Sequence, residues 1–239
     1  MRTRLDLMGL CCLVTTLLSA NVALAQSYVA LHIFSTATGS TAPLVQGPDG
    51  ALYGVSALGG ASGPPASGAV FKVQPDGSSC SIIYSFTNGS DGAGPMAGLI
   101  LSGNTLYGTT KNGGSGGHGT VFKINTDGSG FSTIYGFTAY TSGTNSDGAS
   151  PLGSLDLSGN TLYGTASAGG IANSFGTIFK VNIDGTGFTN LHTFGSVSIQ
   201  DPSFPLAGMI LSGSTLYGTT SSGGGSGANG TVFKIDTNG

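Results

Sequence analysis

The sequence repeats itself four times, and this repetition constrains the fold more than any other feature. The motif Leu-Tyr-Gly begins at Leu52, Leu106, Leu162 and Leu216, with steps of 54, 56 and 54 residues between them. A second marker, Gly-[Ala/Thr]-[Val/Ile]-Phe-Lys, begins at Gly68, Gly119, Gly176 and Gly230. A pair of glycines stands between the two markers in every copy. We therefore place the repeats at about 43–86, 95–137, 151–194 and 205–236.

Each repeat is predicted to contain four short β-strands separated by turns. In the second repeat the strands are expected at 95–101, 105–110, 120–125 and 132–137. The turns between them contain Gly103 and Gly128 beside Asn, Asp and Ser, which are residues that tolerate a positive φ in tight hairpins. The apolar run Leu99-Ile100-Leu101 places hydrophobic side chains on both faces of the sheet. A neighbour is therefore expected on either side of each sheet.

Repeated four-stranded units that need a neighbour on both faces are typical of a β-propeller. We therefore predict an all-β fold with four four-stranded blades. The last repeat lacks its fourth strand, whereas residues 28–34 match the fourth strands of the other repeats. Pairing of this N-terminal strand with the last blade would close the ring and leave no free sheet edge. The alternative is that the sequence is a fragment of a longer array.

Residues 1–25 have the layout of a cleavable signal peptide. Arg2 and Arg4 form a positive start, and the apolar run at 7–18 is too short to span a bilayer. Small residues at 23–25 then offer a cleavage site before Gln26. Residues 26–239 remain as one repeat domain, in which no transmembrane segment is expected. A lipoprotein signal that uses Cys11 or Cys12 is the alternative.

The composition argues against several classes of function. Charged residues make up 7% of the chain, the formal net charge is −3, and no basic cluster could neutralise the phosphates of nucleic acid. Cys80 is the only cysteine after the signal, so no intrachain disulfide can form. The histidines do not cluster, so no zinc site is expected. We expect no cofactor, with Ca²⁺ as the one ion that carboxylates could hold.

The two ends of the predicted blades carry different loops. The turns between the first and second strands and between the third and fourth strands are short and nearly constant in length. The loops at the opposite end vary, since the step from the glycine pair to the next marker glycine is 8, 5, 6 and 6 residues. Scaffolds place function on variable loops that a constant frame holds. This variable face is therefore the candidate ligand surface.

Three aspartates lie on the variable face, each four residues before the proline that opens the next repeat: Asp91, Asp147 and Asp201. As a ligand site, these carboxylates would approach the central axis and bind Ca²⁺ or the hydroxyl groups of a glycan. The alternative is that each aspartate forms an Asx turn that leads into the next strand. The first repeat has Gly39 at this place, so a complete ring of four carboxylates is not expected.

The order of Leu-Tyr-Gly-Thr-Thr, Gly-Gly, Gly-Thr-Val-Phe-Lys-Ile and Asp-Gly, followed by a strand that ends in Phe, resembles the GloVer tandem-repeat family of bacterial surface proteins. The resemblance covers nearly all of the chain after the signal. It implies export, often with a C-terminal sorting or anchoring segment, and it implies no known enzymatic activity. The sequence reaches Gly239 without a hydrophobic tail, so we expect export and not a particular form of anchoring.

These features lead us to expect an exported, non-catalytic module, extracellular or at the cell surface, that binds a glycan or protein ligand or serves a structural role there. We do not expect an enzyme, because repetition places the aspartates symmetrically, whereas acid–base catalysis needs carboxylates in unlike environments. The alternative is a secreted glycan-active hydrolase or lyase that uses the Asp carboxylates.

Overall fold

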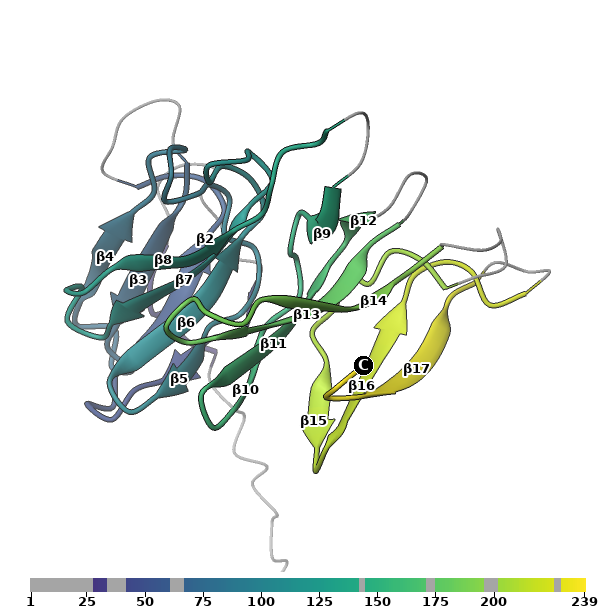
Figure 1. The fold of residues 1–239 in the computed structure, drawn as a ribbon. Helices are drawn as coiled ribbons and strands as arrows, with labels where there is room; N and C mark the ends of the chain where they lie inside the picture. The colour runs from purple at the N-terminus through teal and green to yellow at the C-terminus, as the bar shows by residue number, and fades with distance from the viewer. Residues whose placement is uncertain are drawn as a thin grey trace, which may run out of the picture.

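The computed structural model describes residues 28–33, 42–60, 67–141, 145–170, 175–195, 202–225 and 229–239. These residues form an all-β fold without helices, in which antiparallel sheets follow one another in chain order (Figure 1). The predicted signal peptide lies outside the described residues.

Each repeat forms one sheet, and we call these sheets units 1 to 4. Unit 1 consists of β1 (Val45–Gln46), β2 (Leu52–Ser56), β3 (Ala69–Val73) and β4 (Cys80–Ser85). Unit 2 consists of β5 (Ile100–Ser102), β6 (Thr105–Thr110), β7 (Thr120–Asn125) and β8 (Ser132–Gly136). Unit 3 consists of β10 (Asp156–Ser158), β11 (Thr161–Ala166), β13 (Thr177–Asn182) and β14 (Thr189–Thr193). Unit 4 consists of β15 (Ile210–Ser212), β16 (Thr215–Thr220) and β17 (Thr231–Asp236). A separate pair, β9 (Asn145–Ala149) and β12 (Ala168–Gly170), lies in the loops of unit 3.

The strands predicted for the second repeat are confirmed, except that the first strand is shorter and the fourth, β8, ends at Gly136 rather than at Phe137. β6 and β7 have the predicted bounds, but β5 begins at Ile100 rather than at Pro95. Pro95 has no N–H to donate to a ladder. The segment before β5 instead lies close to the openings of other units, since a β-carbon at Gly98 would come within 2.7 Å of Pro43 and 3.0 Å of Ser154. The segments that open units 1, 2 and 3 therefore converge.

A β-bulge in the fourth strand joins each unit to the next. In unit 2, Val121 pairs with Tyr135 and Phe122 with Thr133, so Ile134 between them is the extra residue. Its carbonyl oxygen lies against Gly185 of unit 3, where a β-carbon would come within 2.8 Å of it. Gly185 also has a φ of +88°, so glycine is required there for two reasons. The same contact joins Ile83 to Gly128 and Leu191 to Gly239.

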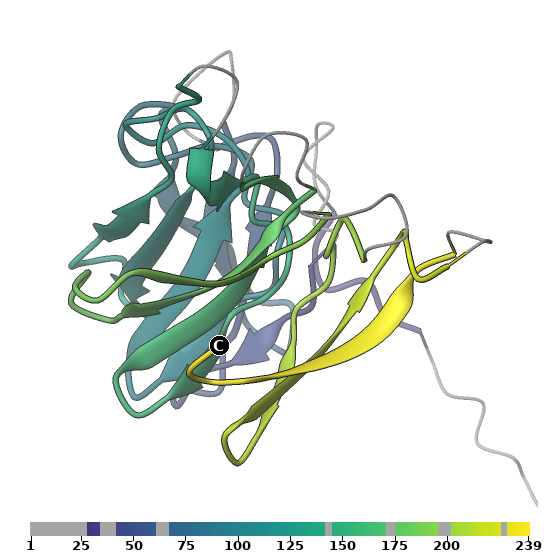
Figure 2. The ribbon, with the colours of Figure 1, turned by 45° about the vertical axis from the view of Figure 1, so that its right-hand side comes forward.

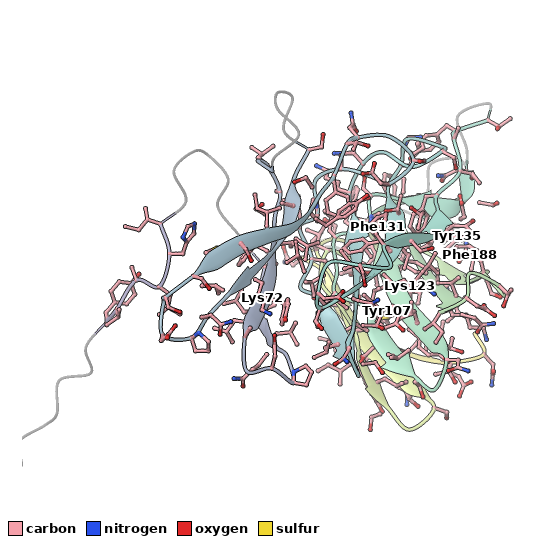
Figure 3. All side chains as sticks on the ribbon, turned by 90° about the vertical axis from the view of Figure 1, so that its left-hand side faces the viewer. Lys72, Tyr107, Lys123, Phe131, Tyr135 and Phe188 are labelled. Carbon is pink, nitrogen blue, oxygen red and sulfur yellow. The ribbon has the colours of Figure 1, made fainter. Side chains whose placement is uncertain are left out.

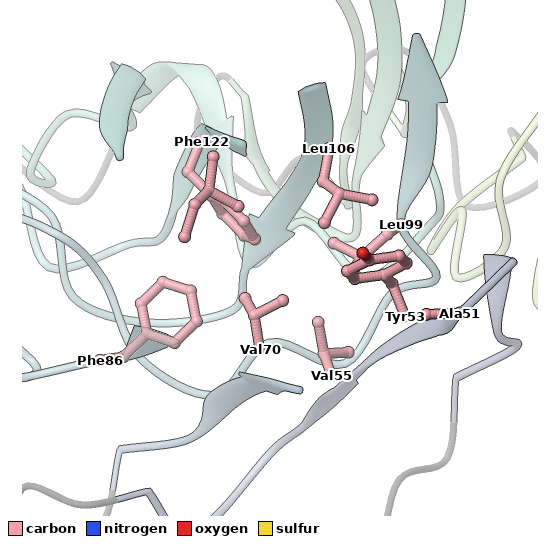
Figure 4. Close-up of a cluster of buried hydrophobic side chains, with 9 residues drawn as sticks. Ala51, Tyr53, Val55, Val70, Phe86, Leu99, Leu106 and Phe122 are labelled. Carbon is pink, nitrogen blue, oxygen red and sulfur yellow. The ribbon is translucent and has the colours of Figure 1, made fainter. Parts of the chain in front are cut away.

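The hydrophobic core lies between the units rather than inside a single sheet. Between units 1 and 2, Tyr53, Val70 and Phe86 pack against Leu106 and Phe122 (Figure 4). Similar clusters join unit 2 to unit 3 and unit 3 to unit 4. Each large apolar side chain buried there stabilises the fold by about 1.5 to 3 kcal/mol. The prediction that every sheet needs a neighbour is therefore confirmed for the junctions between consecutive units.

The expected pairing of the N-terminal strand with the last unit is not made in the described residues. β17 pairs with β16 alone, and residues 28–33 are not assigned to a strand. Leu31 instead lies beside Gly77 of unit 1, where a β-carbon would come within 3.3 Å of its carbonyl oxygen. The units follow a curve in chain order, with unit 4, in yellow, at its end (Figures 1 and 2). In the described residues, β17 therefore has a partner strand only on the side of β16.

Candidate ligand-binding cleft

The loop after each fourth strand is organised around an aspartate. After β4, Asp91 accepts hydrogen bonds from the backbone N–H and the hydroxyl of Thr87, at 2.8 and 2.7 Å. It also accepts bonds from the Tyr84 hydroxyl at 3.2 Å and from the Gly89 N–H at 3.2 Å. Both carboxylate oxygens of Asp91 are therefore occupied by donors of its own loop.

Asp147 repeats this arrangement after β8. It accepts bonds from the Thr138 N–H at 2.8 Å, the Thr138 hydroxyl at 2.7 Å and the Tyr135 hydroxyl at 2.8 Å. Asp91 and Asp147 are 8% and 5% exposed. Buried carboxylates that accept several hydrogen bonds from their own loop stabilise the turn that leads into the next unit. This is the role expected if each aspartate forms an Asx turn.

The predicted set of three aspartates is not brought together among the described residues. Asp91 and Asp147 each lie in the loop of their own unit, and Asp201 lies outside the described residues. The part of the chain that the structure describes contains no group of three or more His, Cys, Asp or Glu side chains that could hold a metal ion. Ligand binding by the three carboxylates therefore stays a prediction.

One of these aspartates lines a cleft of about 730 Å³ between units 2 and 3. β8 contributes Tyr135 to its wall, the segment of β9 contributes Asp147, and β14 contributes Asn190 and His192. Phe188, just before β14, also lines it. The loop after β8, which belongs to the predicted variable face, forms one wall of the cleft, and β8 and β14 form the rest with Phe188.

Stacked aromatic rings form one side of the cleft. The rings of Tyr135 and Phe188 lie 3.8 Å apart between centroids and within 6° of parallel (Figure 3). Burial, together with the hydrogen bond to Asp147, raises the pKa of Tyr135 well above its usual value of 10.0. Its hydroxyl therefore remains neutral and holds the Asp147 carboxylate. Aromatic surface beside fixed polar groups is a chemistry that suits a polar ligand with an apolar face.

Asn190 supplies a hydrogen-bond acceptor that the protein does not use. Its side-chain N–H group donates to the carbonyl of Ser146 at 2.8 Å and to the hydroxyl of Thr193 at 2.9 Å. The side-chain carbonyl oxygen is buried and has no partner among the described residues. A buried polar atom without a partner costs about 1 to 3 kcal/mol, so a ligand or water that donates to it is favoured.

Asn190 and Phe188 were missed by the sequence reasoning, which looked for residues that all repeats share. Asn190 occupies the place of Ile82 and Thr133 in units 1 and 2, as the pairing with the third strand shows. Phe188 corresponds to Cys80 of unit 1 and to Phe131 of unit 2, whose ring stacks on Tyr84 as Phe188 stacks on Tyr135. The signal that could have found Asn190 is its departure from the repeat pattern, since the matching residues are Ile82 and Thr133.

The repeated lysines of the third strands join neighbouring elements and do not form a basic patch. The Lys123 ammonium donates to the Ile183 carbonyl of unit 3 at 3.1 Å, and Lys180 donates to the Thr237 carbonyl of unit 4 at 3.0 Å. Lys72 forms an ion pair of 2.7 Å with Asp49 of its own unit. Its hydrogen bond lowers the pKa of Asp49 to about 2. These lysines therefore hold turns in place.

Comparison with solved structures supports the fold alone. A chain of the nidogen–laminin complex is similar at 16% identity with a TM-score of 0.52, over 77% of this chain and 58% of that one. The GH74 enzyme of Niastella koreensis (20% identity, TM-score 0.48) and a puromycin-hydrolysing peptidase of Mycobacterium tuberculosis (14%, 0.47) are matched over 81% and 83% of this chain. The chain spans only 28% of each of those two proteins. No curated protein matches the sequence.

The described residues include no helix of the length and apolar character that a membrane crossing needs.

The sequence also matches a known repeat, described as the Gloeobacter/Verrucomicrobia repeat, at residues 20–146 and again at 137–239. These two matches cover most of the chain and agree with the repeated units of the fold. The chain therefore belongs to the Gloeobacter/Verrucomicrobia repeat family.

Proposed function

We propose that this chain is an exported, non-catalytic binding module, extracellular or at the cell surface, that takes a glycan or a protein ligand in the cleft between units 2 and 3. The observation that carries the proposal is the unused carbonyl oxygen of Asn190 beside the stacked rings of Tyr135 and Phe188. A polyhydroxylated ligand fits this chemistry, because its hydroxyl groups donate to the amide while its C–H face packs on aromatic carbon.

A binding role is favoured over a glycan-active hydrolase or lyase by the state of the carboxylates. Asp91 and Asp147 have nearly the same environment, since each accepts bonds from one tyrosine hydroxyl and from both groups of one threonine. Glycoside hydrolysis needs two carboxyl groups with different tasks, one that gives a proton and one that stays ionised. The similar environments of Asp91 and Asp147 support a structural role for both residues.

The proposal includes the propeller architecture. The opening segments of the units converge, since Gly208 of unit 4 would place a β-carbon within 2.7 Å of the Ser154 carbonyl oxygen of unit 3. Consecutive units also bury their cores face to face. We infer that the sheets are blades arranged around one axis, and that residues 28–33 supply the fourth strand of the blade that begins with β15.

Binding is tested with purified residues 26–239 on a glycan array, followed by calorimetric titration of each glycan that is retained. The Asn190→Ala variant is expected to lower the affinity about tenfold or more, because a bond to a buried acceptor is lost. The matched control is Thr133→Ala, which changes the same position in unit 2. Equal affinity of the Asn190→Ala variant and the parent would contradict the assignment of the cleft.

Export is tested by expression of the full sequence in a secreting host. We expect mature protein that begins at Gln26 in the periplasm or medium, by N-terminal sequencing. Recovery of an intact form that starts at Met1 in the cytoplasm would contradict it. No cofactor takes part in this proposal.

A further inference from the structure

Two hydroxyl groups in the wall of the cleft between units 2 and 3 act only as hydrogen-bond acceptors towards a ligand. The Tyr135 hydroxyl and the Thr138 hydroxyl both donate to the Asp147 carboxylate, at 2.8 and 2.7 Å. A carboxylate has no proton of its own to donate, so these bonds fix the direction of both hydroxyl protons. Tyr135 and Thr138 therefore offer a ligand their oxygen lone pairs alone.

The amide of Asn190 has the same polarity towards the cleft. Its N–H groups donate to the Ser146 carbonyl and to the Thr193 hydroxyl, at 2.8 and 2.9 Å. Its carbonyl oxygen has no partner among the described residues. A ligand rich in hydrogen-bond donors satisfies these acceptors, whereas a ligand that brings only acceptors leaves them unpaired.

The cleft also has a negative charge in its wall. Asp147 is 5% exposed, and its donors in the described part of the chain are two neutral hydroxyl groups and a backbone N–H. No lysine or arginine is among the described residues that line the cleft, and His192 is the one basic side chain there. A charge near low-dielectric protein acts more strongly than one in bulk water. The Asp147 carboxylate therefore attracts a cation without giving up its bonds to the loop.

We propose that the ligand of this cleft is a glycan with free amino groups, a polymer of the glucosamine type, rather than a neutral or acidic glycan. This inference rests on the proposed function and names the class of ligand. An ammonium group has three N–H donors, no acceptor and a positive charge, so it matches both the acceptors and the Asp147 carboxylate. The sugar ring packs its C–H face on the aromatic carbon of Tyr135 and Phe188, in a cleft of about 730 Å³ (Figure 3).

The junction between units 1 and 2 provides a matched control position. Thr133 occupies the place of Asn190 there and donates its hydroxyl to the Ser90 carbonyl at 3.1 Å. Asn190 makes the corresponding bond to the Ser146 carbonyl. Ser90 and Ser146 are therefore equivalent residues, and both are exposed.

The test compares three oligosaccharides of equal length and linkage, built from glucosamine, glucose or glucuronic acid. Each is titrated by calorimetry into residues 26–239 at a slightly acid pH, at which the amino groups are protonated. We expect the glucosamine oligomer to bind about tenfold or more tightly than the glucose oligomer, and the glucuronic acid oligomer not to bind. Added salt should weaken binding of the glucosamine oligomer and leave that of the glucose oligomer unchanged, because salt screens only the charged pair.

Two lysine variants locate the binding site. Ser146→Lys places a positive charge in the cleft and is expected to lower the affinity for the glucosamine oligomer about tenfold or more. Ser90→Lys adds the same charge at the equivalent residue of the other junction, so its affinity should equal that of the parent. This variant also controls for the change in net charge. Thermal unfolding checks that both variants are folded, and the comparison of oligomers on the parent depends on neither of them.

Equal or tighter binding of the glucose oligomer would overturn the amine assignment and leave the proposed function intact. Tightest binding of the glucuronic acid oligomer would do the same. An equal loss of affinity in Ser90→Lys and Ser146→Lys would show that the amine senses the charge of the whole chain and not the cleft. If none of the three oligomers binds but the array retains another glycan, the amine assignment alone fails. If the array retains no glycan, glycan binding itself fails.

Discussion

The Tyr135 hydroxyl donates a hydrogen bond of 2.8 Å to the Asp147 carboxylate, and this contact ties the end of one unit to the loop that opens the next. The Tyr84 hydroxyl makes the same bond to Asp91 in the preceding unit. Both bonds require a neutral tyrosine, which makes the junctions sensitive to alkaline pH.

The stability of the fold is expected to fall between pH 10 and 12. Burial and the nearby Asp91 carboxylate raise the pKa of Tyr84 from 10.0 to about 12. Tyr84 therefore keeps its proton in the folded state where the unfolded chain has lost it. Its contribution is complete below pH 10 and is lost as the pH rises through the folded value. Urea unfolding at intervals of pH measures the loss, and the Tyr84→Phe variant should have a flatter profile over this window. A variant profile as steep as that of the parent would contradict the assignment.

Removal of the Asp147 side chain is expected to destabilise the fold by about 1 to 3 kcal/mol, because three donors lose their acceptor. The matched control is Asp184→Ala, at an exposed turn where the carboxylate binds only Thr186; this variant should cost less than about 1 kcal/mol. Chemical denaturation compares the two variants. A larger loss for Asp184→Ala than for Asp147→Ala would refute the bracing role.

The Asp147→Ala variant also distinguishes a structural role in the turn from cation binding. If the aspartates only brace their loops, Ca²⁺ leaves the unfolding midpoint of the parent unchanged. If they hold the ion, Ca²⁺ raises the midpoint of the parent by mass action, and Asp147→Ala loses that response. Thermal unfolding with and without Ca²⁺ distinguishes these outcomes. The saturated hydrogen bonds of Asp91 and Asp147 lead us to expect an unchanged midpoint.

Gly185→Ala is expected to be more destabilising than Gly159→Ala, although both residues have a positive φ. At Gly159 (φ +57°) a β-carbon meets open space, so the cost is the backbone strain of about 1 to 2 kcal/mol. At Gly185 the same strain adds to a contact of 2.8 Å with the Ile134 carbonyl oxygen of unit 2. Denaturant midpoints of the two variants check the order. If the two variants lose equal stability, the contact between residue 185 and the Ile134 carbonyl oxygen adds no cost, which would contradict the prediction.

The repeat markers were sufficient to predict the units, because turn glycines and apolar strands act locally and recur. The bounds of β6 and β7 follow directly from them. The shorter β5 could not be predicted, since it depends on the approach of Pro43 and Ser154 from other units to Gly98. Asn190 was missed for a similar reason: its unused carbonyl is visible only once Ser146 and Thr193 are seen to take up its N–H group.

Amide hydrogen exchange of β17 tests the central claim most directly, namely that residues 28–33 are the missing fourth strand of the last unit. β7 and β13 each have a partner on both sides, whereas β17 has one only on the side of β16. If residues 28–33 pair with β17, its outward N–H groups will exchange in the parent as slowly as those of β7 and β13, and Leu31→Asp will speed them up. Fast exchange of these groups in the parent, unchanged by Leu31→Asp, would contradict the claim.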